Sequence, residues 1–486
     1  MRHAITLVAL LAALLLPGCA TNPVTGDQDF VLMSEQQELD LGKEYNQQVL
    51  KQYDKVDDPA LQDYVQRIGQ ELAAVSHRSD IPYHFTVLDS TEVNAFALPG
   101  GYVYITRGIL GYFNSEAELA GVLGHEIGHV TARHSVRQYS AATASSILGT
   151  ILLAQAGGGQ AAADLFQTVQ LAAMRGYGRD QELQADRLGA QYLARAGYDS
   201  DAMMDVIRLL SDQEQYEVRQ AKKEGREPNT YHGVFATHPD NDERLKTVIR
   251  AAKKYQAPNA RPDGHAEYLR HIDGLTFGPG TKQGVVEHHA FLHRELDTGL
   301  RAPDDWTIVN QPQQLVFQAP GDQARMVVTM GQADGKRAPR ELLAAHLSGA
   351  NMADAHTVSA GPLPGYTGIA TQRTKLGDRR VRHAVVRKGD QAWYFAGVTR
   401  EGDAFQRYDD AFMSIIRSLH ALSPAERERA APLHINVITA AAGTRYEDLA
   451  RRAPERVENP AARLRLLNGD WPRGEPAAGR LMKVLQ

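Results

Sequence analysis

The chain has 486 residues, 43% of them hydrophobic and 23% charged, which is typical of a soluble protein with two to four domains. Its 53 basic and 58 acidic side chains give a net charge of −5, and no basic run interrupts the sequence, so we expect no nucleic acid among its partners. A single cysteine excludes an internal disulfide.

Residues 1–18 have the features of an export signal. Arg2 precedes an apolar run, Ala4–Leu16, that is too short to span a bilayer. The Leu-Pro-Gly-Cys ending resembles the box of bacterial lipoproteins, in which Cys19 becomes the lipidated first residue. The resemblance implies a periplasmic protein with a lipid anchor, and Ala20 in place of Asp implies the outer membrane. The alternative is an uncleaved or simply secreted chain.

Residues 34–76 show helical periodicity and predict two amphipathic helices, the first opened by a capping box of Ser34 and Gln37. Residues 83–88 and 102–105 alternate like strands, and the turn Leu98–Gly101 separates the second of them from Phe96.

The next helix carries a metal-binding pattern. Ser115 is a good N-cap, and His125 and His129 bracket an H-E-x-x-H motif. Residues i and i+4 share a helix face, so both imidazoles can hold one metal ion, while Glu126 is placed to touch a water at the metal. Two neutral nitrogen ligands, an open position and a carboxylate base are what metal-assisted hydrolysis requires. The alternative is a pair of ordinary surface histidines.

A third ligand is expected downstream, where Glu182 and Asp186 again stand at i and i+4 on a helix. Glu182 can complete a His-His-Glu site, and Asp186 can accept the second ring N–H of a ligand histidine. A solvated acidic face is the alternative. His134 is expected to lie off the metal-facing side and, like Tyr177, to be structural.

Four segments together resemble one family. They are Asn94–Ile105, the H-E-I-G-H motif with Val130 to His134, the run E-L-Q-A-D-R-L-G from Glu182, and Thr237-His238-Pro239 followed by Glu243-Arg244-Leu245. In this order they resemble the BepA/HtpX-type zinc metallopeptidases of family 48, which are gluzincins.

The resemblance implies one Zn²⁺ per chain, with His125, His129 and Glu182 as ligands and Glu126 as general base. In this context His238 can reach the zinc or the reacting carbonyl, or it can merely cap a helix. Arg244 can balance charge on the tetrahedral intermediate.

The strand segment Asn94, Ala95 and Phe96 can hydrogen-bond an extended peptide as an added strand, or it can only support the core. Residues 141–173 are rich in Ala, Ser, Gly and Gln, and their strongly apolar part is about 7 residues against the roughly 20 that a membrane span needs. We expect a mobile helical flap there, which gates the cleft or faces the membrane.

The expected organisation is α+β. A mainly helical zincin-type domain with a small sheet covers residues 19–258, a linker 259–284, and an α/β domain 285–422 in which strands and helices alternate. This α/β domain distantly resembles the PsbP-like fold. Residues 423–486 show a β-α-α-β order that resembles a LysM domain, which implies binding of N-acetylglucosamine chains; a docking domain for partner proteins is the alternative.

The sequence thus predicts a lipid-anchored zinc endopeptidase that cleaves unfolded or misassembled envelope proteins. Two alternatives differ in class. One is an outer-membrane assembly factor or chaperone whose protease is mostly silent, and the other is a peptidoglycan-directed hydrolase.

Overall fold

The computed structural model describes residues 19–141, 143, 177–224, 250, 253–255, 259–311, 313–333, 337–375 and 377–486. The chain forms two compact units. Unit 1 comprises Met1–Phe277 and His434–Gln486, and unit 2 comprises Gly278–Leu433. None of the helices in these described ranges has the length and apolar character that a membrane crossing requires.

Unit 1 contains a small sheet in the order β3-β5-β4. Its strands are β3 (His84–Leu88), β4 (Ala95–Leu98) and β5 (Tyr102–Thr106). β3 is parallel to β5 and β4 is antiparallel to it. The predicted turn between β4 and β5 is confirmed as the 3-10 helix η1 (Pro99–Gly101), and β4 forms one edge of the sheet.

The two predicted N-terminal helices are confirmed as α2 (Glu35–Gln52) and α3 (Pro59–Ala74), and Ser34 and Gln37 form the expected capping box. The remaining elements of unit 1 that precede unit 2 are β1 (Cys19–Thr21), β2 (Gln28–Phe30), α4 (Arg107–Leu110), α5 (Glu116–Thr131), α8 (Arg179–Arg195), α9 (Ala202–Glu224), α12 (His265–Ile272) and β6 (Thr276–Phe277).

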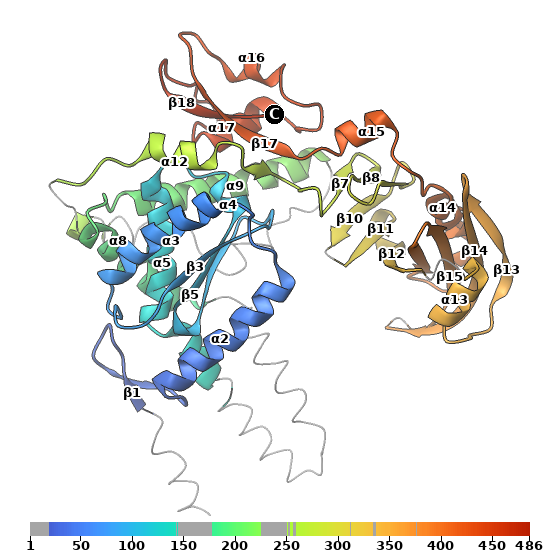
Figure 1. Cartoon of the computed structure of the whole chain (residues 1–486), viewed down its shortest axis with the longest axis horizontal. Coiled ribbons are helices and arrows are strands. Elements are labelled where there is room, and N and C mark those ends of the chain that lie inside the picture. The colour runs from blue at the N-terminus through green and yellow to red at the C-terminus, as the bar shows by residue number, and fades with distance from the viewer. Residues whose placement is uncertain are drawn as a thin grey trace, which may run out of the picture. The chain divides into compact units, whose positions relative to one another are not determined.

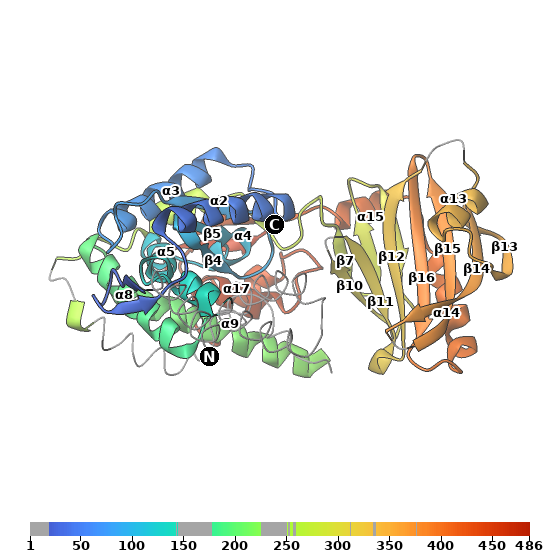
Figure 2. The same ribbon diagram turned by 90° about the horizontal axis from the view of Figure 1, so that it is seen from below.

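Helix α5 is the centre of unit 1. Ser115 caps it by accepting a hydrogen bond from the backbone N–H of Glu118, as the sequence predicts. Every residue of α5 except Glu118 is buried, because α3, α8, α9 and β4 all pack against it (Figure 2). A helix covered on all sides holds its side chains in a water-poor interior, which suits a site that depends on electrostatics.

The C-terminal segment has the expected β-α-α-β order: β17 (Leu433–Thr439), α16 (Tyr446–Ala450), α17 (Pro460–Leu467) and β18 (Leu481–Leu485). Its strands join β6 in a three-stranded sheet of order β18-β17-β6, beside α12 in Figure 1. The expected organisation therefore differs from the observed one. Residues 259–284 include α12 and β6 rather than a plain linker, and the segment expected as a separate last domain packs within unit 1.

Unit 2 is built on a seven-stranded sheet of order β10-β11-β12-β16-β15-β14-β13. Its strands are β10 (Thr307–Gln311), β11 (Gln314–Gln318), β12 (Ala324–Gln332), β13 (Ala353–Ala360), β14 (Leu363–Thr374), β15 (Gly377–Lys388) and β16 (Gln391–Thr399). Every ladder in it is antiparallel. The α/β alternation expected for this region is therefore replaced by an α+β arrangement.

Two helices cover opposite faces of this sheet. Ala384 and Val386 of β15 pack in the core that contains α14 (Phe405–Arg417), whereas Val385 packs with α13 (Pro339–His346). Alternate residues of a strand point to opposite faces, so the middle of β15 is buried on both sides of the sheet. The other elements of unit 2 are η2 (Pro320–Asp322), α15 (Pro424–Arg429) and a small sheet of β7 (Val285–Glu287), β8 (Ala290–His293) and β9 (Thr298–Arg301).

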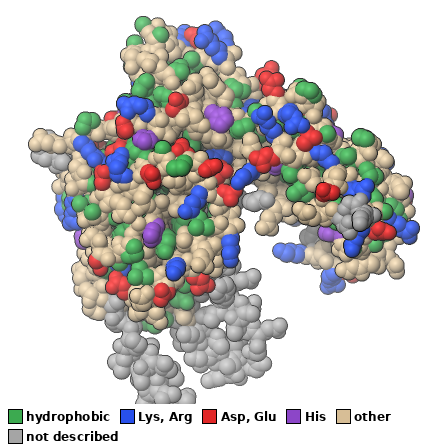
Figure 3. Space-filling model, in the orientation of Figure 1, with side chains coloured by type: hydrophobic (Ala, Val, Ile, Leu, Met, Phe, Trp, Pro, Cys, Tyr) green, Lys and Arg blue, Asp and Glu red, His purple; other side chains and the backbone are tan. Residues whose placement is uncertain are grey.

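The surface carries charges of both signs. On the face seen in Figure 3, Lys and Arg side chains are interspersed with Asp and Glu side chains.

Candidate metal centre

Three buried side chains from two helices meet at one point. His125 and His129 of α5 place their Nε2 atoms 3.0 Å apart. The Glu182 carboxylate of α8 lies 3.5 Å from Nε2 of His125 and 3.4 Å from Nε2 of His129. In the described part of the chain, these three side chains form a group that could share one metal ion. Their ligand atoms all lie within 4.8 Å of one another. Two imidazole nitrogens and one carboxylate oxygen that converge in this way fit a Zn²⁺ ion.

Glycines allow the two helices to approach closely enough for this arrangement. A Cβ atom built on Gly128 of α5 would lie 3.0 Å from the backbone oxygen of Ala185 on α8. One built on Gly189 of α8 would lie 3.0 Å from the backbone nitrogen of His125. Because no side chain separates the backbones at these positions, Glu182 can reach both histidines.

The second nitrogen of each histidine also has a partner. Nδ1 of His125 lies 2.8 Å from a carboxylate oxygen of Asp186, as the sequence predicts. This contact leaves Nε2 for the metal and fixes the orientation of the ring. Burial alone would lower the pKa of His125, but the hydrogen bonds to Asp186 and Glu182 outweigh it and raise this pKa to about 10.

His129 is held by residues whose position was not predicted. Its Nδ1 lies 2.8 Å from Nδ1 of His134, whose Nε2 lies 3.1 Å from the Gln184 side-chain oxygen. Burial lowers the pKa of His134 to about 4, so its imidazole is neutral at physiological pH. The ring of Tyr177 stacks on His129 with centroids 3.8 Å apart, and its hydroxyl contacts Ser135. His134 thus contacts the ring nitrogen of His129 that lies away from the metal point, a contact that the sequence did not predict.

A backbone turn explains why His134 folds back. Helix α5 ends at Thr131, and Arg133 adopts a left-handed conformation with φ of 55°. The Arg133 guanidinium bonds the buried carboxylate of Glu38, with Nε 2.9 Å from Oε2. This tertiary contact stabilises the turn. No local sequence pattern predicts the contact, because its two residues are far apart in the chain.

Glu126 lies between the two histidines on α5, with only 1% of its surface exposed. Burial raises the pKa of the neighbouring Tyr177, and the charges of Glu126 and Glu182 raise it further. Tyr177 therefore keeps its proton beside the centre at physiological pH.

The proposed substrate strand corresponds to β4. Asn94, just before it, bonds Thr106 through its backbone. Ala95 is buried, and the half-buried ring of Phe96 stacks on Tyr104 with centroids 4.8 Å apart. His238 and Arg244 lie outside the described residues, as does most of segment 141–173.

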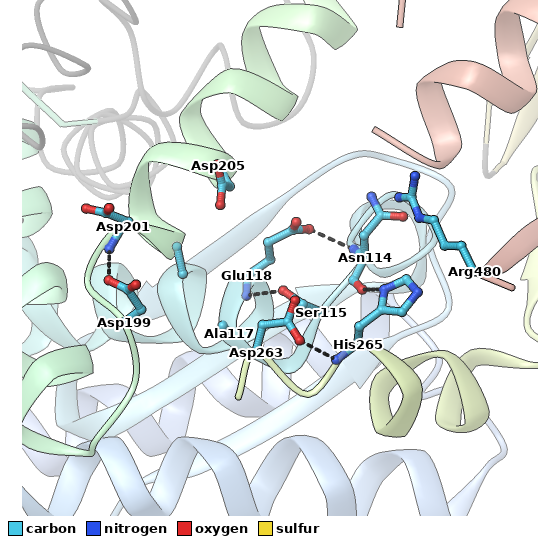
Figure 4. A pocket seen from close by; sticks show the side chains of 11 residues that line it. Asn114, Ser115, Ala117, Glu118, Asp199, Asp201, Asp205, Asp263, His265 and Arg480 are labelled. Atoms are coloured by element: carbon cyan, nitrogen blue, oxygen red, sulfur yellow. Dashed lines mark hydrogen bonds between the residues drawn. The ribbon is translucent and has the colours of Figure 1, made fainter. Parts of the chain in front are cut away.

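A pocket of about 450 Å³ lies at the other end of α5 (Figure 4). It is rich in carboxylates, and none of its lining residues belongs to the metal centre. Glu118, on its wall, precedes His125 by about two helical turns. The lining residues are Asn114, Ser115, Ala117, Glu118, Asp199, Asp201, Ala202, Asp205, Asp263, His265 and Arg480.

Part of the chain is similar to known peptidases. Residues 59–252 match peptidase family M48. The chain is 33% identical over 244 residues to the beta-barrel assembly-enhancing protease of Escherichia coli strain K12, covering 48% of this chain and 47% of that one. It is 31% identical over 197 residues to the mitochondrial metalloendopeptidase OMA1 of Arabidopsis thaliana, covering 40% and 37%. The chain spans about half the length of the first curated relatives it matches.

Among solved structures, the cyanobacterial PsbP protein of Synechocystis sp. PCC 6803 aligns with 29% of this chain and 95% of its own. The sequence identity is 12% and the TM-score is 0.23.

Proposed function

Because residues 59–252 match peptidase family M48, we propose that the chain is a zinc-dependent endopeptidase of the bacterial cell envelope. The observation that carries the proposal is the convergence of His125, His129 and Glu182 around one point, with Glu126 buried beside them. Each ligand comes from the segment in which the sequence motif predicts it.

The chemistry divides between the metal and the protein. His125, His129 and Glu182 would hold a Zn²⁺ ion, which would supply Lewis-acid chemistry for the scissile carbonyl and for water near neutral pH. Asp186 and His134 orient the two imidazoles by contacting their Nδ1 atoms, on the side away from the metal point. Glu126 accepts the proton of the attacking water and later gives it to the leaving amine.

Substrate binding is assigned to the edge of β4. Among the described residues, this strand pairs with β5 on one side and with no strand on the other. It also packs against α5, which carries the histidines. An extended peptide can add to such an edge through backbone hydrogen bonds, which favours unfolded chains over particular sequences. His238 and Arg244 are kept as candidates for stabilising the oxyanion.

The substrates proposed are unfolded or misassembled envelope proteins. The name of the curated relative, a beta-barrel assembly-enhancing protease, supports this class. We also propose that Cys19 carries a lipid that anchors the chain to the outer membrane from the periplasmic side, since the residues before it resemble a lipoprotein signal.

The same relative's name favours a second candidate, an assembly factor whose protease is mostly silent. That function requires the fold and not the base, so a Glu126→Gln variant would rescue an assembly defect. A peptidoglycan-directed hydrolase would instead release wall fragments and leave an unfolded protein intact.

The decisive experiment compares the chain from Ala20 onward with its Glu126→Gln variant. Zinc per chain is determined in both, and cleavage of unfolded casein is followed. We expect equal zinc, with the cleavage rate lower in the variant by about 10²–10⁴-fold, the usual contribution of a general base. Equal zinc without cleavage by either protein would favour the assembly factor, and absence of zinc from both would refute the metal centre.

A further inference from the structure

The turn that precedes α5 is held by the C-terminal segment. Residues 111–114 connect α4 to the N-cap Ser115, and β18 lies against them. The Nζ atom of Lys483 on β18 donates to the backbone oxygens of Gly111 at 2.9 Å, Tyr112 at 3.2 Å and Phe113 at 2.7 Å. Lys483 has 0% of its surface exposed, so its ammonium group makes its hydrogen bonds within the protein and not with solvent.

Lys483 is itself fixed in place. The side-chain oxygen of Asn468 accepts the backbone N–H of Lys483, and the Asn468 amide donates to the Lys483 carbonyl. Nearby, His265 bridges the carbonyls of Asn114 and Leu481 through its two ring nitrogens. The strand therefore presents the ammonium group to the turn from a rigid frame.

Helix α5 holds the same turn from its other side. The Glu118 carboxylate accepts the backbone N–H of Asn114 at 2.7 Å, and the Ser115 hydroxyl accepts the backbone N–H of Glu118 at 3.1 Å (Figure 4). Burial lowers the pKa of Lys483, and the nearby carboxylate of Glu118 opposes this decrease. A buried cation persists only where partners of this kind compensate it.

We propose that Lys483 is a positioning residue for the metal centre: its ammonium group fixes the turn that begins α5 and thereby sets where His125 and His129 meet Glu182. A helix transmits a displacement of its first turn along its axis, because its backbone hydrogen bonds keep its length constant. The ligand atoms of α5 must match those of α8 closely, since a metal site tolerates deviations of only about 0.2 Å. The inference rests on the proposed function, because it concerns the same site.

The test compares wild type with Lys483→Met, which keeps an unbranched side chain as far as the Cε position and removes the ammonium donors. Zinc affinity is measured by competition with a chromophoric chelator, and hydrogen exchange is followed in peptides that cover residues 111–119. We expect the variant to remain folded, to bind zinc about tenfold more weakly, and to exchange faster in this region. Where casein is cleaved, kcat is expected to fall while KM is unchanged, since β4 is not altered.

The matched control is Arg473→Met. Arg473 lies at an exposed position in the same C-terminal segment, and it takes no part in the hydrogen bonds that hold Lys483 and the turn. Its substitution should leave zinc affinity and exchange at residues 111–119 unchanged. Wild-type zinc affinity and exchange in folded Lys483→Met would overturn the proposal, and both readouts remain valid even if wild type cleaves no casein.

Should Lys483→Met fail to fold, Glu118→Ala provides the second measurement, since it frees the same turn from the α5 side. It is expected to weaken zinc binding and to speed exchange in the same region. Wild-type behaviour of Glu118→Ala in both measurements would reject the proposal.

Discussion

At the scale of single residues, the metal ligands depend on the groups behind them. Each imidazole uses one nitrogen toward the metal point and the other toward a buried partner, which is Asp186 for His125 and His134 for His129. Such partners fix the tautomer and the ring orientation, and they strengthen the histidine as a ligand.

Replacing Asp186 by Asn keeps the size of the side chain and removes its charge. We expect zinc affinity to fall by about 10–100-fold, the usual effect of losing such a partner, and peptidase activity at limiting zinc to fall with it. Competition with a chelator measures the affinity. Asp180→Asn, at an exposed position in the first turn of the same helix, is the control, and an Asp186→Asn variant that binds zinc like wild type would show that this contact is dispensable.

The sequence predicts the ligands and misses one of their supports for a physical reason. His125, His129, Glu182 and Asp186 lie at i and i+4 on helices, so helical geometry alone places each pair on one face. His134 follows the end of α5, and its position depends on the left-handed Arg133 and on the distant carboxylate of Glu38. Periodicity carries no information about such a turn.

At the scale of elements, the centre depends on the close contact between α5 and α8. Gly124 and Gly128 face Ala185 and Gly189 across this contact, and glycine is needed there because a larger side chain would force the two backbones apart. The distance between the helices decides whether Glu182 reaches the histidines.

Gly128→Val tests this dependence. Even a Cβ at this position would lie 3.0 Å from the Ala185 oxygen and 3.1 Å from its Cα, so the branched side chain must displace α8. We expect weaker zinc binding and a lower unfolding temperature, with a loss of stability of about 1–3 kcal/mol, as is usual for overpacking. Gly178→Ala, at the N-cap of α8, where an added Cβ would make only an ordinary contact with Gln181 at 3.8 Å, should bind zinc normally; normal binding by Gly128→Val as well would mean that the helix spacing is not critical.

Element prediction succeeded where local signals are strong. The caps at Ser34 and Ser115 gave the starts of α2 and α5. Strands β13 and β14 of unit 2 have weak local signals, because the residues of β13 are mostly exposed and show no alternation, and β14 contains Gly365 and Gly368, which are uncommon in strands. These strands are stabilised by hydrogen bonding to neighbouring strands and not by the intrinsic β-propensity of their residues.

At the scale of the whole molecule, unit 2 contains a buried carboxylate that joins several of its segments by hydrogen bonds. Glu426 of α15 accepts hydrogen bonds from Arg301 at 2.8 Å, from His420 at 3.2 Å and from the backbone of Ser423 at 3.0 Å. Burial would raise the pKa of Glu426, but these bonds outweigh it and lower the pKa from 4.5 to about 2.

The lowered pKa makes unit 2 sensitive to acid. Glu426 contributes stability that is fully present above pH 4.5 and is lost as the pH falls toward about 2, because the unfolded chain binds the proton first. Glu426→Gln should remove this part of the pH dependence and lower stability near neutral pH. Urea unfolding of the full chain at pH 6, 4 and 3, followed by tryptophan fluorescence, measures it; Trp306 and Trp393 lie in unit 2.

The control is Glu428→Gln, at an exposed position on the same helix. It should retain the wild-type pH dependence. If Glu426→Gln also retains it, the acid sensitivity of unit 2 has another source.

The division into units was the least predictable feature. The changes of composition near residues 258 and 423 suggest boundaries, yet α12, β6 and the C-terminal segment pack within unit 1. Lys483 and Gly111 are 372 residues apart, and a contact of such separation leaves no trace in a local pattern. Only the tertiary structure shows which segments share a core.

Unit 1 is discontinuous, and this has a consequence for biosynthesis. Unit 2 is encoded between the two parts of unit 1, so a ribosome completes all of unit 2 before it makes β17 and β18. The sheet that these strands form with β6, and the support that Lys483 gives to α5, cannot exist in the nascent chain until then. The metal centre can therefore gain its final geometry only after unit 2 has been made.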